Sequence, residues 1–472
     1  MNNLPSAPVK IKVSQDKIFI GLGLCVLLSI HFLILKTITF TAWPEMFSYP
    51  YLINKGFLIY KDFAHPYVPL LSLILSCYYK ITGLSLISNQ LFTWNLILIN
   101  DVLIFFIAKK FLKNLYILAP VSIYILLQPI FEGNMLWFDL ATTPFILTSF
   151  LCLLYIQNSP KKFFWFGFSL SLALLTKQQS VVLILPIALL LIVDKKIRKF
   201  WGYFISGLTV PASCIFLLLL TQGILKEYFF WTLEFPLIWL PSFPGYAELP
   251  GLKNTLILTT LFGLSSFFLI KNILKTDFFE KIILISIIGT VIMSFPRFSY
   301  FHLQPAIATL AVFSVVVLRK NPKMAILLLT PVIATGLLLW KDYRPFIGVE
   351  KARFYDKQDI SLANFVSQNS RPDEAVYFLG PHSLIFVLAD RIPPKPWIEN
   401  FVWHFEIPGM QKNQISGFEK EKSTVIFRQG PISGSWYDLG TYQPKEITSY
   451  IENNFEMTAK NESGIEVWKR RQ

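Results

Sequence analysis

The chain has 472 residues, of which 54% are hydrophobic, 16% aromatic and only 15% charged. Soluble domains carry about 25% charged residues, so the composition excludes an ordinary soluble protein and indicates a polytopic membrane protein. The formal net charge of +14 does not indicate nucleic-acid binding, because the lysines and arginines fall in short clusters between apolar runs, as membrane topology signals do.

The N-terminus predicts a short cytoplasmic tail followed by an uncleaved first span. Lys10, Lys12 and Lys17 precede an apolar segment over about 18–40. That segment is longer than a signal-peptide core, and no small-residue cleavage site follows it. We therefore expect a tail over 1–17 and a membrane domain that begins at residue 18.

Eleven apolar segments are candidate transmembrane helices, because a helix needs about 20 mainly apolar residues to cross a bilayer. The fifth, sixth and ninth are short, as are helices that end early at a polar cavity. The approximate limits are 18–40, 90–108, 115–131, 140–157, 163–176, 179–193, 201–222, 253–270, 282–295, 302–318 and 324–340. They predict a mainly α-helical transmembrane bundle over 18–340.

Five basic clusters set the predicted orientation. They occupy every second connection, which places those loops and the N-terminus in the cytoplasm and the C-terminus outside. The clusters are Lys109/Lys110/Lys113, Lys161/Lys162, Lys195/Lys196/Arg198/Lys199, Lys271/Lys275/Lys281 and Arg319/Lys320/Lys323.

The first external loop contains two further apolar stretches, 46–58 and 67–82. Both are short, and the second carries Lys80. If 67–82 crossed the membrane, the Lys109 cluster would lie outside, against the charge bias. We therefore predict interfacial helices on the outer leaflet for these stretches.

The tail after the last span changes character. Segments 374–380 and 424–428 have the pattern of buried strands, whereas 359–369 and 444–455 have the pattern of helices. The simplest interpretation is a small extracytoplasmic α/β domain over 341–472.

Several familiar kinds of site are missing from the sequence. The cysteines all lie in apolar stretches, which supports neither a disulfide framework nor a thiolate metal site. No phosphate-binding glycine loop, Ser-His-Asp order or H-E-x-x-H helix is present, so soluble nucleotide-dependent catalysis is not expected. We interpret His31, inside the first span, as a packed core residue.

The predicted topology gathers scattered polar residues at the outer face. They are Glu45, Asp62, His65, Glu132, Asn134, Asp139, Lys177, Gln178, Glu234, Arg297 and His302. Glu45 and Asp62 are suited to remove a proton from an acceptor hydroxyl or amine. Prolines and aromatic residues around them, such as Trp43 and Pro66, favour a packed loop over a solvated one.

Two cations, Lys177 and Arg297, fall on the side that normally lacks positive charge. A phosphate or pyrophosphate at the lipid headgroup level is their natural counter-charge. A cation at the edge of a span also snorkels to the interface, so a purely structural role stays open for both.

Other outward loops give weaker signals. Segment 131–139 combines acids, an amide and aromatic rings, which is the set of groups that binds sugars, although interfacial aromatic residues explain it about as well. The loop over 223–252 lines a substrate groove or lies on the membrane, and we favour the second interpretation. His65 and His302 come from distant loops and make only a weak metal signal.

At these residues the sequence resembles the glycosyltransferase C superfamily, in particular bacterial relatives of protein O-mannosyltransferases and of the lipid A aminoarabinose transferase. The family pattern G-x-x-x-Y-[RK]-D-F-x-x-P-x-x-P-L-L reads here as Gly56-Phe57-Leu58-Ile59-Tyr60-Lys61-Asp62-Phe63-Ala64-His65-Pro66-Tyr67-Val68-Pro69-Leu70-Leu71. Thr176-Lys177-Gln178 and the segment from Pro296-Arg297 to His302 are also similar to that group. The resemblance covers about 18–340 and, less specifically, the tail.

The resemblance implies an inverting membrane glycosyltransferase that moves a sugar from a polyprenyl-phosphate donor to an acceptor at the outer face of the cell membrane. It makes Glu45 or Asp62 the catalytic acid and places Lys177, Arg297 and His302 at the donor phosphate. The family usually has Asp-Glu in its first loop, whereas this chain has Pro44-Glu45, so both acids stay candidates. Further substrate-binding candidates are His65, Glu132, Asn134, Asp139 and Gln178. We infer no metal and no cofactor, and the sugar and the acceptor (protein, lipid or glycan) stay open.

Two alternatives from other classes stay open. A lipid-linked sugar flippase or other transporter requires charged residues near the bilayer midplane, and Asp101 in the second span is one such residue. A non-catalytic envelope scaffold is favoured to some degree by the departure at Pro44.

Overall fold

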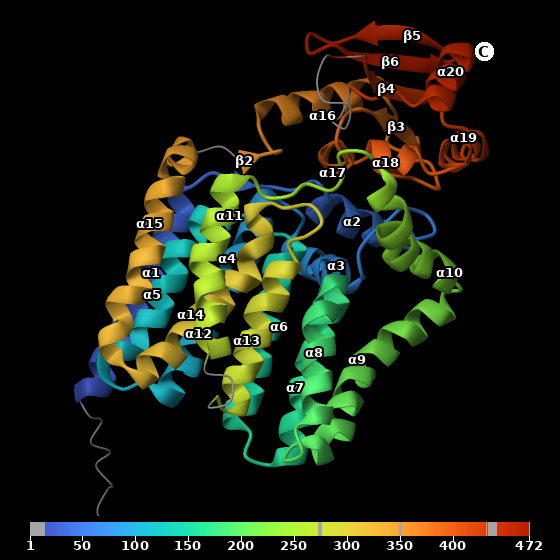
Figure 1. The fold of residues 1–472 in the computed structure, drawn as a ribbon. Helices are drawn as coiled ribbons and strands as arrows, with labels where there is room; N and C mark the ends of the chain where they lie inside the picture. Colours follow the sequence, from blue (N-terminus) through green and yellow to red (C-terminus); the bar gives the residue numbers. More distant parts are fainter. Residues whose placement is uncertain (1–14, 272–275, 349–351, 431, 433–440, 472) are drawn as a thin grey trace, which may run out of the picture.

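The computed structural model describes residues 15–271, 276–348, 352–430, 432 and 441–471. Residues 1–14 of the predicted tail and Lys275 of one basic cluster lie outside this part of the chain. A bundle of long helices carries a smaller, sheet-containing domain at one end, built from the C-terminal residues (Figure 1).

Helices occupy each of the eleven ranges that the sequence predicts to cross the membrane. They are α1 (Gln15–Thr37), α4 (Leu86–Phe111), α5 (Ala119–Leu127), α6 (Phe138–Tyr155), α7 (Ser159–Thr176), α8 (Val181–Val193), α9 (Trp201–Thr221), α11 (Leu252–Leu258), α12 (Leu264–Lys271), α13 (Phe278–Ile292), α14 (Gln304–Lys320) and α15 (Ala325–Tyr343), with α11 and α12 sharing one range. Seven of the described helices are long and apolar enough to cross a membrane. The count of eleven spans and the direction of the chain stay predictions.

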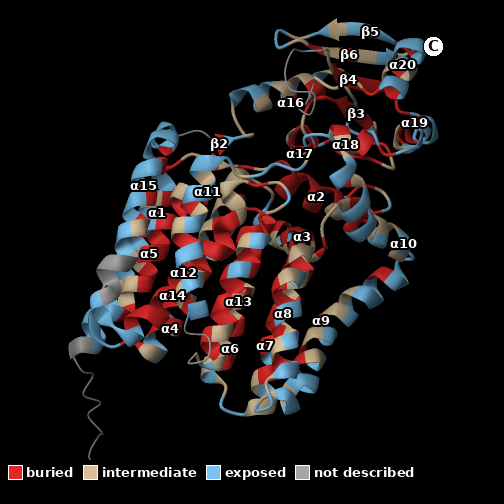
Figure 2. Cartoon of the chain, viewed as in Figure 1, coloured by how far each residue is buried: buried red, intermediate tan, exposed pale blue. Residues whose placement is uncertain are grey.

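Apolar side chains fill the bundle and also cover its outside. Every residue from Gln304 to Leu318 of α14 is buried, whereas α1 and α9 expose leucine, isoleucine and phenylalanine side chains (Figure 2). A lipid environment makes such an outer surface favourable. Gly167 of α7 and Gly207 of α9 let these helices touch, because a Cβ at Gly167 would lie 2.2 Å from the Phe204 carbonyl oxygen.

Short helices at the end of the bundle nearest the C-terminal domain position the candidate site (Figure 1). The two apolar stretches of the first loop form α2 (Glu45–Asn54) and α3 (Leu70–Thr82). After α9 the chain forms α10 (Leu225–Phe229) and a π-helical segment, Phe230–Trp239.

The C-terminal domain is a four-stranded sheet with helices packed against it. Its strands are β3 (Val376–Leu379), β4 (Val425–Gln429), β5 (Phe455–Lys460) and β6 (Ile465–Arg470), in the order β3-β4-β6-β5. Its helices are α16 (Lys357–Asn369), α17 (Leu384–Leu388), α18 (Val402–Phe405), α19 (Met410–Lys420) and α20 (Lys445–Asn454). β3 and β4 pair in parallel, and β4–β6 and β5–β6 are antiparallel. The hairpin β5–β6 was not predicted, because β5 has an exposed, mainly polar face that gives no buried-strand signal.

The C-terminal domain is joined to the first loop by backbone pairing and a shared apolar core. β1 (Phe40–Thr41) pairs in parallel with β2 (Ala352–Arg353). The Trp397 N–H donates to the Asp62 carbonyl over 2.9 Å, and the Ala64 N–H donates to the Trp397 carbonyl over 2.8 Å. One continuous apolar cluster includes Phe63 and the sheet residues Tyr377 and Phe427. The domain therefore holds the first loop rigidly against the end of the bundle.

Candidate functional site

Three chain segments converge beneath the C-terminal domain, and each carries an aromatic residue one or two positions before a polar one. They are Trp43 to Glu45, Trp137 to Asp139, and Phe301-His302. The Trp43 ring lies 5.2 Å from Trp137 and 5.8 Å from Phe301, and the Trp137 and Phe301 rings are 5.8 Å apart. Because the rings contact one another, the polar residues that follow them are brought to the same region.

Asp139, Lys177 and His302 form a buried ionic cluster. The Lys177 ammonium donates to Asp139 Oδ1 and, over 3.2 Å, to the Met293 carbonyl. His302 Nδ1 lies 2.8 Å from Asp139 Oδ2. Lys177 is only 3% exposed and Asp139 is fully buried. The sequence offers Lys177 no acidic neighbour, but the fold supplies one from α6, as a buried ammonium requires.

Glu45 begins α2 and is buried, with 6% of its surface exposed. Its Oε2 atom has no hydrogen-bond partner within the described part of the chain. Burial raises the pKa of Glu45 to about 7, partly offset by its own backbone N–H and by nearby His382. A carboxyl group with a pKa near neutrality and a free oxygen is suited to accept and donate protons.

Asp62, the other candidate acid, is engaged in the joint with the C-terminal domain. Its Oδ2 accepts from the Leu58 N–H over 2.9 Å and from Lys395 Nζ over 3.0 Å. The side chain is 18% exposed. These bonds commit Asp62 Oδ2 to the joint between the first loop and the C-terminal domain.

Three other predicted residues have their polar groups used within the fold. His65 bonds through Nδ1 to the Tyr67 carbonyl over 2.7 Å and through Nε2 to Ser72 Oγ over 2.8 Å, and burial lowers its pKa to about 4. The Asn134 amide donates to two carbonyls at the end of α1 and accepts from Trp94. Gln178 donates to the Pro66 carbonyl over 2.9 Å, which places Lys177 on the same side of the bundle as the first loop.

Glu132 and Arg297 lie at the edge of this region. Glu132 lines a separate cavity of about 310 Å³ together with Arg353 and Ser299. The Ser299 hydroxyl donates to the Glu132 carboxylate over 3.5 Å. The Arg297 guanidinium lies over the Trp403 ring of the C-terminal domain, 5.6 Å from its centroid, and 3.9 Å from Glu248. Arg297 is thus within electrostatic reach of His302 but outside the buried cluster.

Two site residues were missed by sequence reasoning. Tyr67 stacks on Phe138 with centroids 4.0 Å apart and lies within electrostatic reach of both Glu45 and Asp139, so it links the two acids. Its place in the motif of the first loop was the available signal. Glu399, in a loop of the C-terminal domain, is buried close to Glu45. No local pattern marks this residue in a polar tail.

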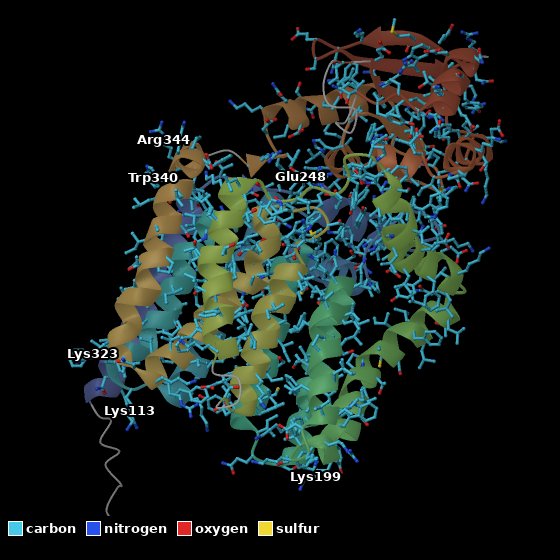
Figure 3. All side chains as sticks on the ribbon, viewed as in Figure 1. Lys113, Lys199, Glu248, Lys323, Trp340 and Arg344 are labelled. Atoms are coloured by element: carbon cyan, nitrogen blue, oxygen red, sulfur yellow. The ribbon has the colours of Figure 1, made fainter. Side chains whose placement is uncertain are left out.

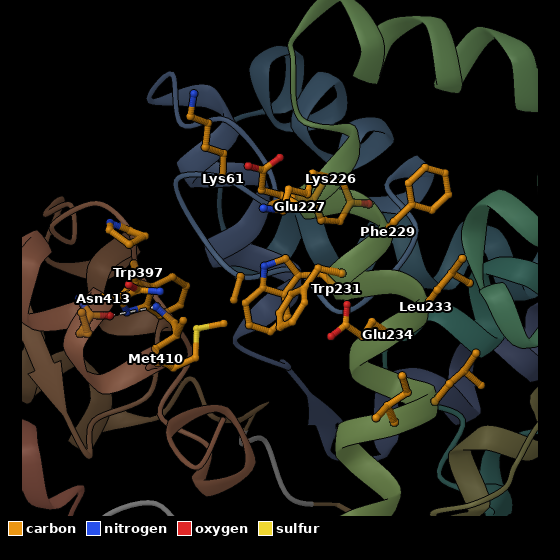
Figure 4. A pocket seen from close by; sticks show the side chains of 18 residues that line it. Lys61, Lys226, Glu227, Phe229, Trp231, Leu233, Glu234, Trp397, Met410 and Asn413 are labelled. Atoms are coloured by element: carbon orange, nitrogen blue, oxygen red, sulfur yellow. Dashed lines mark hydrogen bonds between the residues drawn. The ribbon is translucent and has the colours of Figure 1, made fainter. Parts of the chain in front are cut away.

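A large apolar groove of about 860 Å³ lies at the joint between the first loop and the C-terminal domain. It lies between the segment that carries Phe229, Trp231 and Leu233 and the C-terminal domain residues Trp397 and Met410 (Figure 4). Lys61, Lys226, Glu227 and Glu234 also line the groove. The loop over 223–252, which we expected to lie on the membrane, therefore also forms a wall of this groove.

Among the described residues, no group of three or more His, Cys, Asp or Glu side chains is placed to hold a metal ion.

Known proteins with this fold are found by structure and not by sequence. No protein-family model and no curated protein matches the chain. ArnT from Cupriavidus metallidurans in the apo state matches with a TM-score of 0.59 at 10% identity, over 96% of this chain and 98% of that one. The same protein bound to undecaprenyl phosphate matches with a TM-score of 0.58 at 9% identity, over the same shares of each chain.

A second neighbour comes from an archaeon. It is the oligosaccharyltransferase AglB from Archaeoglobus fulgidus in complex with an inhibitory peptide and a dolichol-phosphate. It matches with a TM-score of 0.55 at 10% identity, over 98% of this chain and 75% of that one. This chain therefore has the fold of ArnT and of the oligosaccharyltransferase AglB.

Proposed function

We propose that this chain is an integral membrane glycosyltransferase that moves a sugar from a polyprenyl-phosphate donor to an acceptor at the outer face of the cell membrane. The fold supports this proposal, because similar structures contain undecaprenyl phosphate or dolichol-phosphate. The observation that carries it is the convergence of Glu45 with the Asp139–Lys177–His302 cluster at one end of the bundle.

The distribution of charge supports the outward placement of the site. Lys113, Lys199 and Lys323, one from each of three basic clusters, lie at the end of the bundle opposite the C-terminal domain (Figure 3). Arg344 and Glu248 lie at the other end, with the site. Cytoplasmic loops carry the excess of lysine and arginine, so the end with the site is the extracytoplasmic one.

The proposed reaction is a single displacement that inverts the anomeric carbon. An acceptor oxygen or nitrogen forms a bond to that carbon while the bond to the donor phosphate oxygen breaks, and polyprenyl phosphate leaves with the electron pair. The acceptor proton passes to ionised Glu45. Lys177, with His302 and Arg297 nearby, stabilises the charge that grows on the leaving phosphate.

The apolar groove suits a lipid substrate. Leu237 and Ile238 in its wall are more than half exposed, at 72% and 62%. A prenyl or acyl chain in the groove would cover these side chains, while Lys61 and Lys226 at its edge match an anionic headgroup. The groove adjoins the first loop at Tyr60, Lys61 and Ala64.

The transporter alternative is less well supported. Asp101 lies in the bundle interior, but its Oδ2 lies 2.7 Å from His31 Nδ1, and His31 Nε2 lies 3.2 Å from Gln128. This arrangement is a local hydrogen-bonded cluster. A transport path requires a series of such groups across the membrane.

Reconstitution with polyprenyl-phosphate sugars tests the proposal through the release of polyprenyl phosphate. We expect release by the wild type, loss of release in Glu45→Gln, and substantial release in Asp62→Asn, because Asp62 serves the joint with the C-terminal domain. The exposed Glu419→Gln variant is the matched control. Failure of the wild type with every donor would refute the function, and full activity of Glu45→Gln would move the base elsewhere.

A further inference from the structure

A cavity of about 310 Å³ lies between the end of α1, the loop that precedes α6 and the end of α15. Its walls include the aromatic residues Trp43, Tyr300 and Phe301 and the charged residues Glu132, Asp342 and Arg353. Ligand pockets occupy roughly 300–1,000 Å³ and combine an apolar lining with a few placed polar groups. This cavity therefore has the size and the lining of a site for a small ligand.

Glu132 stands in a backbone conformation that favours glycine. Its φ is 52°, in the left-handed region that disfavours a side chain. The turn is fixed at the next residue, because a Cβ at Gly133 would lie 2.2 Å from the Gln128 carbonyl oxygen, and the Gln128 amide donates to the Gly133 carbonyl over 2.9 Å. A glutamate at such a position indicates a use for its carboxylate.

The same turn leaves the Glu132 carboxylate almost unused. Asn134 anchors the turn by donating to the carbonyls of Leu35 and Ile38 over 3.0 and 2.9 Å. Within the described part of the chain, the Glu132 carboxylate accepts one long bond, the 3.5 Å bond from Ser299. A carboxylate can accept several hydrogen bonds, so this one is held in place with capacity for a ligand.

Arg353 supplies the opposite charge from β2. β1 lies between β2 and the turn, because Thr41 pairs with Arg353 and also with Met135. The Arg353 guanidinium lies 5.9 Å from the centroid of the Trp43 ring and 4.8 Å from that of Phe354. Among the described residues it has these ring contacts and no hydrogen bond, so its N–H groups are available to a ligand.

The charges that line the cavity balance one another. Asp342 is paired with Lys253 over 2.5 Å, and Glu132 and Arg353 are opposite in sign. A phosphate needs an excess of positive charge and an ammonium group an excess of negative charge, so a neutral ligand fits best. A sugar ring offers hydroxyl groups that donate to a carboxylate and accept from a guanidinium, and C–H faces that pack on aromatic rings.

The cavity shares its aromatic wall with the proposed reacting groups. One residue separates Trp43 from Glu45, which limits their Cα atoms to about 7 Å apart. Phe301 directly precedes His302, and the centroids of their rings are 4.1 Å apart. Because the Trp43 and Phe301 rings also contact each other at 5.8 Å, a ligand packed on them lies next to the residues proposed to carry out the transfer.

We propose that this cavity is a saccharide subsite, which holds one neutral sugar ring of a substrate. Glu132 and Arg353 bond to its hydroxyl groups, and Trp43 and Phe301 pack on its face. This inference rests on the proposed function and deepens it. The ring belongs either to the acceptor, which is then a glycan or a glycolipid, or to the donor, and the experiments below separate the two.

Saturation-transfer NMR of the purified full chain with a panel of neutral methyl hexosides and pentosides tests binding without any donor. We expect at least one glycoside to receive saturation, and Glu132→Gln and Arg353→Gln each to weaken its binding roughly tenfold. Glu419→Gln and Arg344→Gln, at exposed residues outside the cavity, should bind it as the wild type does. Binding of no glycoside, equal binding by all variants, or binding of inorganic phosphate in place of glycosides would each overturn the inference.

Glu132→Gly separates a binding role from a structural one. Glycine tolerates the φ of 52°, so the midpoint of thermal unfolding should stay at or above that of the wild type while glycoside binding is lost. A lower midpoint with unchanged binding would make Glu132 structural and overturn the inference. If Glu132→Gly does not fold, Glu132→Gln carries the comparison.

Release of polyprenyl phosphate then identifies the substrate that carries the ring. Glu132→Gln should raise the KM for that substrate and leave kcat near the wild-type value, and the bound glycoside should compete with the same substrate. If no donor supports release but glycosides bind as described, the proposed function fails and the subsite stands. If release proceeds and no glycoside binds, the function stands and the subsite fails.

Discussion

Two buried clusters of charge lie under the C-terminal domain, and they are built in opposite ways. In the Asp139–Lys177–His302 cluster an acid is surrounded by basic groups, so the charges are balanced. Glu45 and Glu399 are two buried acids within electrostatic reach of each other, and one oxygen of each has no hydrogen-bond partner among the described residues. The first arrangement pairs opposite charges, whereas in the second burial raises the pKa of Glu45 to about 7. The difference separates a binding element for an anion from an acid–base element.

Breaking the balanced cluster should have the largest effect. Lys177→Met leaves the Asp139 carboxylate buried beside His302 alone, and we expect a loss of about 3–5 kcal/mol in the free energy of unfolding, because a buried charge loses its partner. The double variant Lys177→Met/Asp139→Leu should recover much of that loss. Denaturant unfolding in detergent measures both.

A matched pair at the surface provides the control for this prediction. Lys253 and Asp342 are also an ion pair, but their side chains are 44% and 60% exposed. Lys253→Met should cost less than about 1 kcal/mol. Equal losses for Lys177→Met and Lys253→Met would contradict the buried character of the first cluster.

Changing the protonation state of Glu45 should have the next largest effect. Because Glu45 acts as a base in its ionised form and its pKa is raised to about 7, release of polyprenyl phosphate should rise with pH through about 7 and level off above it. At pH 5 the rate should be about a hundredfold lower than the plateau. A flat profile between pH 5 and 8 would exclude Glu45 as the base.

The raised pKa of Glu45 also predicts how the free energy of unfolding changes with pH. The pKa of Glu45 in the folded protein, about 7, lies above its ordinary value of 4.5. The folded state therefore holds this proton more tightly, so the contribution of Glu45 to stability is complete below pH 4.5 and is lost as pH rises through 7. Glu45→Gln should flatten this dependence in thermal unfolding measured from pH 4.5 to 8.

The joint between the first loop and the C-terminal domain should give the smallest effect. Asp62 and Lys395 are partly exposed, at 18% and 33%, so Lys395→Ala should cost about 1 kcal/mol in stability and tenfold or less in activity. Limited proteolysis would report any loosening of the domain. A loss of activity as large as that of Glu45→Gln would return Asp62 to the position of catalytic acid.

Much of the fold follows from the sequence, because apolar length and charge clusters are local signals. The positions of the bundle helices, the two short helices of the first loop, and the elements β3, β4, α16 and α20 were predictable from runs of residue types. The hairpin β5–β6 was not, because its strands are amphipathic and mostly polar. The motif around Asp62 indicated a fold family, and Asp62 lies in the joint with the C-terminal domain, where it accepts from Lys395.

The arrangement of the site was only partly predictable. The sequence predicted that Lys177 and His302 lie on the same side of the membrane, but it gave no sign that Asp139 would pair with both. The sequence also did not distinguish Glu45 from Asp62. One oxygen of Glu45 has no hydrogen-bond partner among the described residues, whereas Asp62 accepts a hydrogen bond from Lys395. Glu399 lies far along the chain in a domain where acids are ordinary.

The sequence by itself determined which segments prefer lipid, which loops share a side, and which rare polar residues had to be placed there, since each of these depends on hydropathy and charge within a short window. Tertiary structure alone decided which acid meets a base and which meets another acid. Such pairings depend on distance and burial between residues remote in the chain, and those quantities exist only once the C-terminal domain has closed over the first loop.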